Sequence, residues 1–267
     1  MLTKAIKKEM WSSPLIENFN QSQKKMNLSN QLSPKAYTQF AGLLYLLIAI
    51  TGGFSIGYMP TIIIVSGDAA ATAQNMLDNQ WLFRLGIAGD IAVLLLEIVL
   101  TVMLYRIFKE VSKTVAMVAT FSRLAMSVIM GFNLLNYLIP VLLLGGSNYL
   151  AVFETDQLEA LALVFLDAHK YGEYVWQLFF GLHLIALGYL IFKSSHFPKI
   201  PGILMMVGSV GYSGDSISRF ISLNNASISI VVGVLLAIAV LGELSFTFWL
   251  LIKGVKASNI TSKPIAK

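Results

Sequence analysis

The chain has 267 residues, of which 56% are hydrophobic and only 12% are charged, and its formal net charge is +5. A soluble domain is typically about 25% charged, so this chain has too few charges to cover a water-facing surface. It contains no cysteine, which excludes disulfides, thiolate metal sites and cysteine nucleophiles. The composition therefore predicts an all-α polytopic membrane protein, a bundle of transmembrane helices.

The N-terminal segment, residues 1–35, is polar and basic, and we expect it to form a cytoplasmic tail. Met26 begins a stretch that resembles an ordinary translation start, so the sequence alone does not establish whether residues 1–25 are translated. The first apolar segment begins near Tyr37, too far into the chain for a cleaved signal peptide. We interpret it as a retained first span.

Six apolar segments follow, each long enough to cross a hydrocarbon core of ~30 Å as a helix. They define a membrane domain over residues 36–256, with a short cytoplasmic tail at 257–267. Pro140 predicts a kink near the far end of the third span. An amphipathic helix over residues 156–168 is expected to precede the fourth. The expected spans are 37–59, 82–107, 114–144, 171–192, 200–221 and 227–252.

Basic residues are concentrated on one side of this predicted topology. Fifteen of the 19 Lys and Arg residues lie in the two tails and in the loops at 106–113 and 193–199, whereas the loops on the other side contain only Lys170. The positive-inside rule makes the basic side cytoplasmic, and six spans return the C-terminus to that side of a bacterial inner membrane. Attraction to anionic lipid explains the positive charge, so we expect the bilayer and no nucleic acid as a partner.

Ionisable residues inside the spans are the candidate site residues, because a charge near a helix centre costs about 2.5–3.5 kcal/mol on insertion scales. Asp90 and Glu97 are seven residues apart and share a face of the second span. Arg123, on the antiparallel third span, is expected at a depth between them. These three residues form the predicted polar cluster. It is either an ionic staple between helices, or a proton relay or counter-charge for a polar substrate. Two carboxylates facing one arginine favour a protonatable site or a cationic ligand.

Further polar residues in the spans are secondary candidates. Gly208, Gly211 and Asp215 share a face of the fifth span, where close helix packing is the simpler interpretation. Arg219 follows Asp215 by four residues, a spacing typical of an intrahelical ion pair. We expect His183 to hydrogen-bond a neighbouring helix, with proton handling as the alternative, and we predict no metal site or cofactor because three converging ligands are lacking. The secondary positions are Arg84, His183, Asp215, Arg219 and Glu243.

An ordered set of stretches resembles a family of bacterial multi-pass membrane proteins known only as domain of unknown function 4386. The resemblance covers about residues 36–256 and implies a location in the bacterial inner membrane, but it implies no activity. Pro201 stands where the family suggests an aliphatic residue. The stretches are GLLYLL (42–47), LFRLGIAGD (82–90), RLAMSVI (123–129), FFGLHLIALGYLIFKS (179–194), PKIPGILM (198–205), LGEL (241–244) and FWLLIKGV (248–255). The polar residues within or beside them are Arg84, Asp90, Arg123, Asp215 and Glu243.

Two functions remain open from the sequence. The first is an uncharacterised membrane protein that binds or moves a small solute, a lipid-like molecule or a proton through the polar cluster. The second is an accessory or regulatory membrane protein that acts through helix–helix contact with a partner, its polar residues being structural. The sequence has no phosphate-binding loop and no nucleophile motif, so it gives little support to an enzyme. Neither the substrate nor the oligomeric state follows from it.

Overall fold

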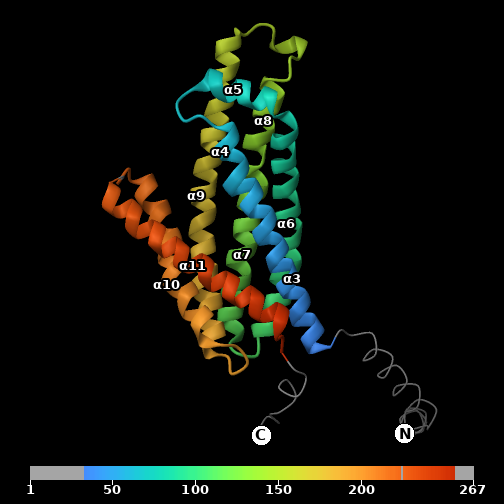
Figure 1. The fold of residues 1–267 in the computed structure, drawn as a ribbon, viewed down its shortest axis with the longest axis vertical. Coiled ribbons are helices and arrows are strands. Elements are labelled where there is room, and N and C mark those ends of the chain that lie inside the picture. Colours follow the sequence, from blue (N-terminus) through green and yellow to red (C-terminus); the bar gives the residue numbers. More distant parts are fainter. Residues whose placement is uncertain (1–32, 224, 256–267) are drawn as a thin grey trace, which may run out of the picture.

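A computed structural model describes residues 33–223 and 225–255, and this part of the chain is helical without any strand (Figure 1). The predictions for residues 1–32 and 256–267 lie outside the described residues. The elements in order are α3 (Pro34–Gly52), the π-helical turn η1 (Gly53–Tyr58), α4 (Met59–Ile63), α5 (Ala69–Asp78), α6 (Gln80–Phe108), α7 (Lys113–Asn133), α8 (Leu135–Leu143), the 3-10 turn η2 (Asn148–Leu150), α9 (Thr155–Lys193), α10 (Lys199–Phe220) and α11 (Ala226–Ile252).

Five helical stretches of the described chain are long and apolar enough to cross a membrane, which confirms the prediction of an all-helical fold with several candidate spans. The predicted span at 200–221 corresponds to α10, which is not among the five. Its Gly and Ser residues, together with Asp215 and Arg219, lower its hydropathy. The count of six spans therefore stays a prediction. The five stretches are Pro34–Ile63, Gln80–Phe108, Lys113–Leu143, Thr155–Lys193 and Ala226–Ile252.

The helices form an upright bundle from which one hairpin leans away (Figure 1). α9 packs against α5, α7, α8 and α10, and α6 packs against α3 and α7. α10 and α11 pack along each other, and α11 then crosses the bundle to contact α3. Their contact is close because the glycine-lined face of α10 meets α11: a Cβ at Gly208 would overlap the backbone of Ala239, and one at Gly211 would lie 2.7 Å from Leu235 Cβ. α3 begins and α11 ends at the same, lower end of the molecule (Figure 1).

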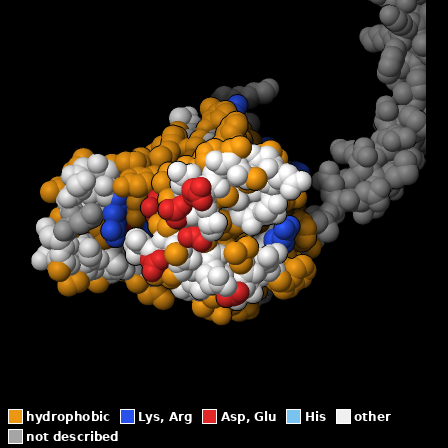
Figure 2. All heavy atoms as spheres, turned by 90° about the horizontal axis from the view of Figure 1, so that it is seen from above, with side chains coloured by type: hydrophobic (Ala, Val, Ile, Leu, Met, Phe, Trp, Pro, Cys, Tyr) orange, Lys and Arg blue, Asp and Glu red, His pale blue; other side chains and the backbone are white. Residues whose placement is uncertain are grey.

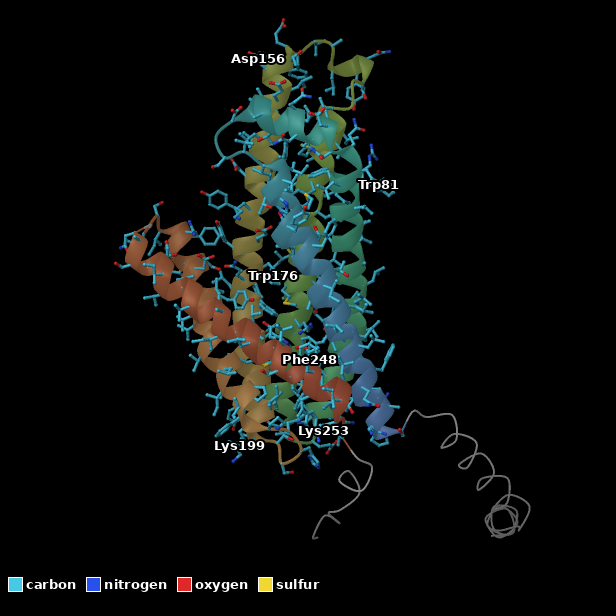
Figure 3. All side chains as sticks on the ribbon, in the orientation of Figure 1. Trp81, Asp156, Trp176, Lys199, Phe248 and Lys253 are labelled. Carbon is cyan, nitrogen blue, oxygen red and sulfur yellow. The ribbon has the colours of Figure 1, made fainter. Side chains whose placement is uncertain are left out.

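Charge is separated along the bundle, and its flanks are apolar. Lys199 and Lys253 lie at the lower end and Asp156 at the upper end (Figure 3). Acidic side chains gather on the upper end face, with hydrophobic side chains around its rim (Figure 2). Large apolar side chains point outward along the flanks; Phe132, for example, is 71% exposed and Leu95 62%. Such a surface is suited to lipid, which would cover it.

Two of the long stretches contain an irregularity on the N-terminal side of a proline. η1 lies just before Pro60, which cannot donate a backbone hydrogen bond, and the wider turn lets the Met59 N–H bond to the Phe54 carbonyl. The second break separates α7 from α8 at Leu134, six residues before Pro140. The kinked third stretch was expected from Pro140, but the interruption lies more than one turn earlier.

α9 is one continuous helix of 39 residues, whereas the sequence suggested an amphipathic helix at 156–168 followed by a separate span. It begins with a capping box in which the Glu154 N–H donates to Gln157 Oε1 at 3.1 Å. At 1.5 Å per residue the helix is roughly 58 Å long, so it extends beyond a ~30 Å hydrocarbon core. No proline or glycine pair interrupts residues 156–171, which explains why the two predicted segments join.

Candidate functional site

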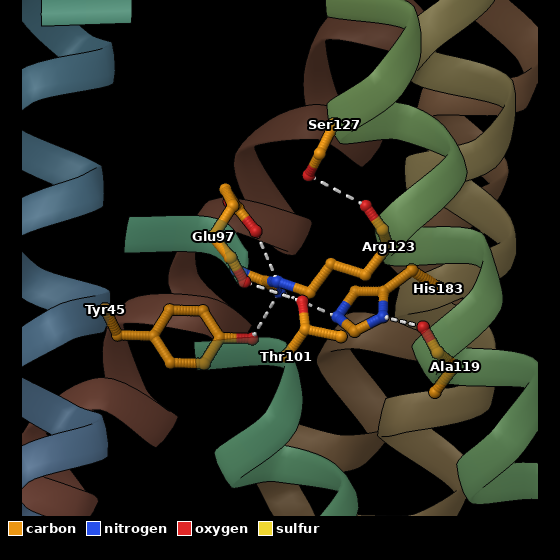
Figure 4. A network of polar contacts seen from close by, with 7 residues as sticks. All are labelled: Tyr45, Glu97, Thr101, Ala119, Arg123, Ser127 and His183. Carbon is orange, nitrogen blue, oxygen red and sulfur yellow. Dashed lines mark hydrogen bonds and ion pairs between the residues drawn. The ribbon is translucent and has the colours of Figure 1, made fainter. Parts of the chain in front are cut away.

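Four helices meet at the guanidinium group of Arg123, whose side chain is almost fully buried (Figure 4). Its Nε forms an ion pair with the Glu97 carboxylate of α6. Its Nη1 donates to the Tyr45 hydroxyl of α3 at 3.1 Å and to Nε2 of His183 on α9 at 2.8 Å. We call Tyr45, Glu97, Arg123 and His183 the arginine network.

The hydrogen bonds of His183 fix its tautomer. Nδ1 lies 2.8 Å from the carbonyl oxygen of Ala119, which can only accept, so Nδ1 carries the hydrogen. Nε2 then has a lone pair that accepts from Arg123. Both nitrogens of the neutral ring are engaged, and the side chain connects α9 to α7 as a hydrogen-bonding residue.

The arginine network is internally balanced. One cation faces one carboxylate, and the hydroxyl groups of Thr101 and Ser127 bond to the backbone carbonyls of Glu97 and Arg123 at 2.6 and 3.0 Å. The ion pair itself leaves the network without net charge. The arginine network therefore links α3, α6, α7 and α9 to one another.

A cavity of about 110 Å³ adjoins the arginine network. Its walls come from α3, η1, α6, α7, α9 and α11, so α10 contributes none of them. Trp176 and Phe180 of α9 provide aromatic walls. The polar residues that line it are Tyr45, Asp90, Glu97, Arg123, Ser127, Glu243 and Thr247.

Two of these lining carboxylates have neither an ion pair nor a hydrogen bond of full geometry in the described chain. Asp90 is 4% exposed, and in the described chain neither of its oxygens has a hydrogen bond of full geometry, although the Ser55 hydroxyl lies beside it. Glu243 of α11 likewise makes no carboxylate hydrogen bond or ion pair with any described residue. Since Arg123 already pairs with Glu97, the cavity has two uncompensated carboxylates. We call Asp90 and Glu243 the unpaired carboxylates.

Comparison with known proteins places the chain in a family. The model of the family described as "Domain of unknown function (DUF4386)" matches residues 40–254. The chain belongs to this family. The resemblance predicted from the ordered stretches is thereby confirmed. An uncharacterized protein of Archaeoglobus fulgidus is 29% identical over 179 residues, which cover 67% of this chain and 89% of that relative. No solved structure matches the chain significantly.

The structure of this DUF4386 protein brings together only part of the predicted polar cluster. Arg123 pairs with Glu97 but has no ion pair with Asp90 among the described residues, because Asp90 lies seven residues, or ~10 Å, farther along α6. Two secondary positions join the cluster from distant helices: His183 through Arg123, and Glu243 through the cavity.

The other secondary positions lie elsewhere. Arg84 is exposed near the upper end of α6. Asp215 and Arg219 form an intrahelical ion pair at 3.3 Å on α10, and neither lines the cavity. The Arg219 guanidinium lies 6.0 Å from the centre of the Tyr174 ring. These three residues are thus separate from the DUF4386 cavity.

Several lining residues of the DUF4386 cavity were not recognised from the sequence. Tyr45 and Thr247 are isolated polar residues in apolar helices, and nothing in their spacing indicates which helix they face. Trp176 lies seven residues before His183, so a shared helix face was recognisable, but its place in a cavity wall was not. Phe180 belongs to an apolar run that could equally face lipid.

Proposed function

We propose that this DUF4386 protein is a six-span protein of the bacterial inner membrane that binds a small solute or a proton in its intramembrane cavity. The observation that supports this function is the pair of carboxylates, Asp90 and Glu243, which line one cavity and have no ion pair and no hydrogen bond of full geometry among the described residues. An uncompensated buried charge is costly, and inside a membrane such groups commonly mark a proton or ion pathway.

The proposed topology counts α10 as the sixth span. α10 packs along both α9 and α11 and runs back toward the upper end of the bundle. The helices before and after it, α9 and α11, both run toward the lower end. Six crossings agree with the two described ends lying at the same end of the molecule. The basic residues at that end favour a cytoplasmic position for both termini.

The polar residues fall into two groups: those that link helices to one another, and those whose side chains are available to a solute. Arg123, Glu97 and His183 satisfy one another, so their removal is expected to affect folding first. Asp90 and Glu243 stabilise nothing by hydrogen bonding among the described residues, yet they border open space. The unpaired carboxylates are therefore the proposed binding groups.

The absence of cysteine from the sequence allows a clean accessibility test. Ser127→Cys and Thr247→Cys each place one thiol in the cavity wall, whereas Ser122→Cys places one on α7, buried but outside the lining. In membranes treated with a small, water-soluble cationic thiosulfonate, we expect the first two variants to react and the Ser122 control to stay unmodified.

An unreactive thiol at both lining positions would contradict a solute-accessible cavity. Equal reaction at Ser122 would show that the reagent reaches α7 without using the cavity, which also counts against the proposal. Recovery of a stoichiometric membrane partner together with unreactive lining thiols would favour the accessory-protein hypothesis instead.

A further inference from the structure

We infer that the cavity accepts a small organic ammonium ion, whose charge is compensated by the unpaired carboxylates Asp90 and Glu243. This inference rests on the proposed function and specifies its ligand class. It combines four observations on the same cavity: the charge of its walls, the unused acceptor atoms, the aromatic lining and the volume.

The charge of the cavity walls favours a cation. Three carboxylates and one guanidinium border the cavity, and the guanidinium forms an ion pair with one of them, Glu97. An anion would face three carboxylates, and the one guanidinium is already paired with Glu97 and bonded through Nη1 to Tyr45 and His183. A positive ligand would compensate the two carboxylates that the protein leaves unpaired.

The unused hydrogen-bonding atoms match an ammonium group. Both oxygens of Asp90 are buried acceptors without a hydrogen bond in the described chain. The carboxylate of Glu243 adds further acceptors from α11, on a different wall. An alkylammonium group has N–H donors only and no acceptor, so its donors complement this set. Hydrogen bonds between ionised partners are about twice as strong as neutral ones.

The aromatic walls suit the organic part of such a ligand. Trp176 and Phe180 stack with ring centres 4.8 Å apart and an interplanar angle of 16°. Aromatic rings attract cations and also pack well against alkyl groups. A bare metal ion would gain little from these rings, and the described residues contain no group of three His, Asp or Glu side chains placed to hold one. The lining therefore favours an organic cation over a metal ion.

The volume limits the size of the ligand. A cavity of about 150 Å³ can hold benzene, so about 110 Å³ is enough for about four or five non-hydrogen atoms. A lipid-like molecule is too large to be enclosed. For so few atoms the dissociation constant cannot be tighter than about 10 μM, given the efficiency ceiling for small ligands.

Isothermal titration calorimetry of the purified full chain in detergent tests the inference with three probes of equal size. Isopropylammonium is cationic, 2-propanol is neutral and acetate is anionic. We expect isopropylammonium to bind at least tenfold more tightly than the other two. Glu243→Gln should weaken that binding at least tenfold, the effect of losing one charge-assisted hydrogen bond. Asp215→Asn, a membrane carboxylate outside the cavity, is the matched control and should leave the affinity unchanged.

Equal binding of 2-propanol, or unchanged affinity in Glu243→Gln, would overturn the inference. If Glu243→Gln does not accumulate as folded protein, Asp90→Asn provides the same test on α6. Failure of isopropylammonium to bind, with Thr247→Cys still reactive toward the thiosulfonate, would refute the ammonium ligand and leave the proposed function standing. Failure of both experiments would refute the two together.

Discussion

Removal of Arg123 should destabilise the fold, and simultaneous removal of Glu97 should restore much of the loss. Arg123→Met leaves the Glu97 carboxylate, which is 5% exposed, without its cation. Removing one partner of a buried ion pair costs about 3–5 kcal/mol. The hydrogen bonds to Tyr45 and His183 contribute about 1 kcal/mol each, so we expect a total loss of about 5–7 kcal/mol.

The double variant Glu97→Leu/Arg123→Met replaces the pair with apolar side chains and leaves no orphan charge. Such replacements are often neutral or stabilising, so the double variant should be more stable than Arg123→Met by at least about 2 kcal/mol. Denaturant unfolding in one detergent, followed by circular dichroism, measures the free energies. Arg219→Met is the control, because its partly exposed ion pair with Asp215 should contribute less than about 1 kcal/mol.

The reasoning is refuted if Arg123→Met unfolds at the same denaturant concentration as the wild type. It is also refuted if the double variant is no more stable than the single one. Either result would mean that Arg123 and Glu97 do not satisfy each other, and that the arginine network does not fasten the helices.

Two further predictions concern helix packing and topology. Gly208→Ala should lower the free energy of unfolding by about 1–3 kcal/mol in the same assay, because its Cβ would overlap the Ala239 backbone. The control Gly233→Ala, which has nothing within 4 Å of the added Cβ, should leave stability unchanged. A larger loss in Gly233→Ala than in Gly208→Ala would contradict the α10–α11 packing. Reporter fusions at both termini should report the cytoplasm, and a fusion in the loop at 145–153 should report the opposite face; a C-terminal reporter on that opposite face would remove α10 as a span.

Helix periodicity and the spacing of charges were enough to predict the pairing of α6 with α7. The seven-residue spacing of Asp90 and Glu97, with Arg123 on the next antiparallel helix, predicted a common face, and Arg123 does meet Glu97. Spacing could not show that Arg123 pairs with only one carboxylate. That choice depends on the tertiary environment, where Tyr45 and His183 hold the guanidinium beside Glu97.

The contribution of α11 could not be predicted, since it depends on the crossing of distant helices. Glu243 was recognised as a buried charge that needs a partner, but no sequence pattern relates α11 to α6 or α7. The π-helical turn before Pro60 was not foreseen either, and it places Ser55 beside Asp90. Sequence thus indicated which residues were costly in a membrane, while the cavity emerged only from how the helices cross.

Residues that link helices, the arginine network, are distinguished here from residues that are proposed to bind a ligand, the unpaired carboxylates. Thermal unfolding of Glu243→Gln in detergent, without added ligand, tests this distinction most directly. Glu243 has no hydrogen bond or ion pair to lose, and its attraction to Arg123 is opposed by repulsion from Glu97 and by the cost of burying its charge. We therefore predict an unchanged melting temperature or a rise of roughly 2–4 °C per kcal/mol gained. A clear fall in the melting temperature would show that Glu243 stabilises the fold, and would contradict its assignment as an unpaired binding group.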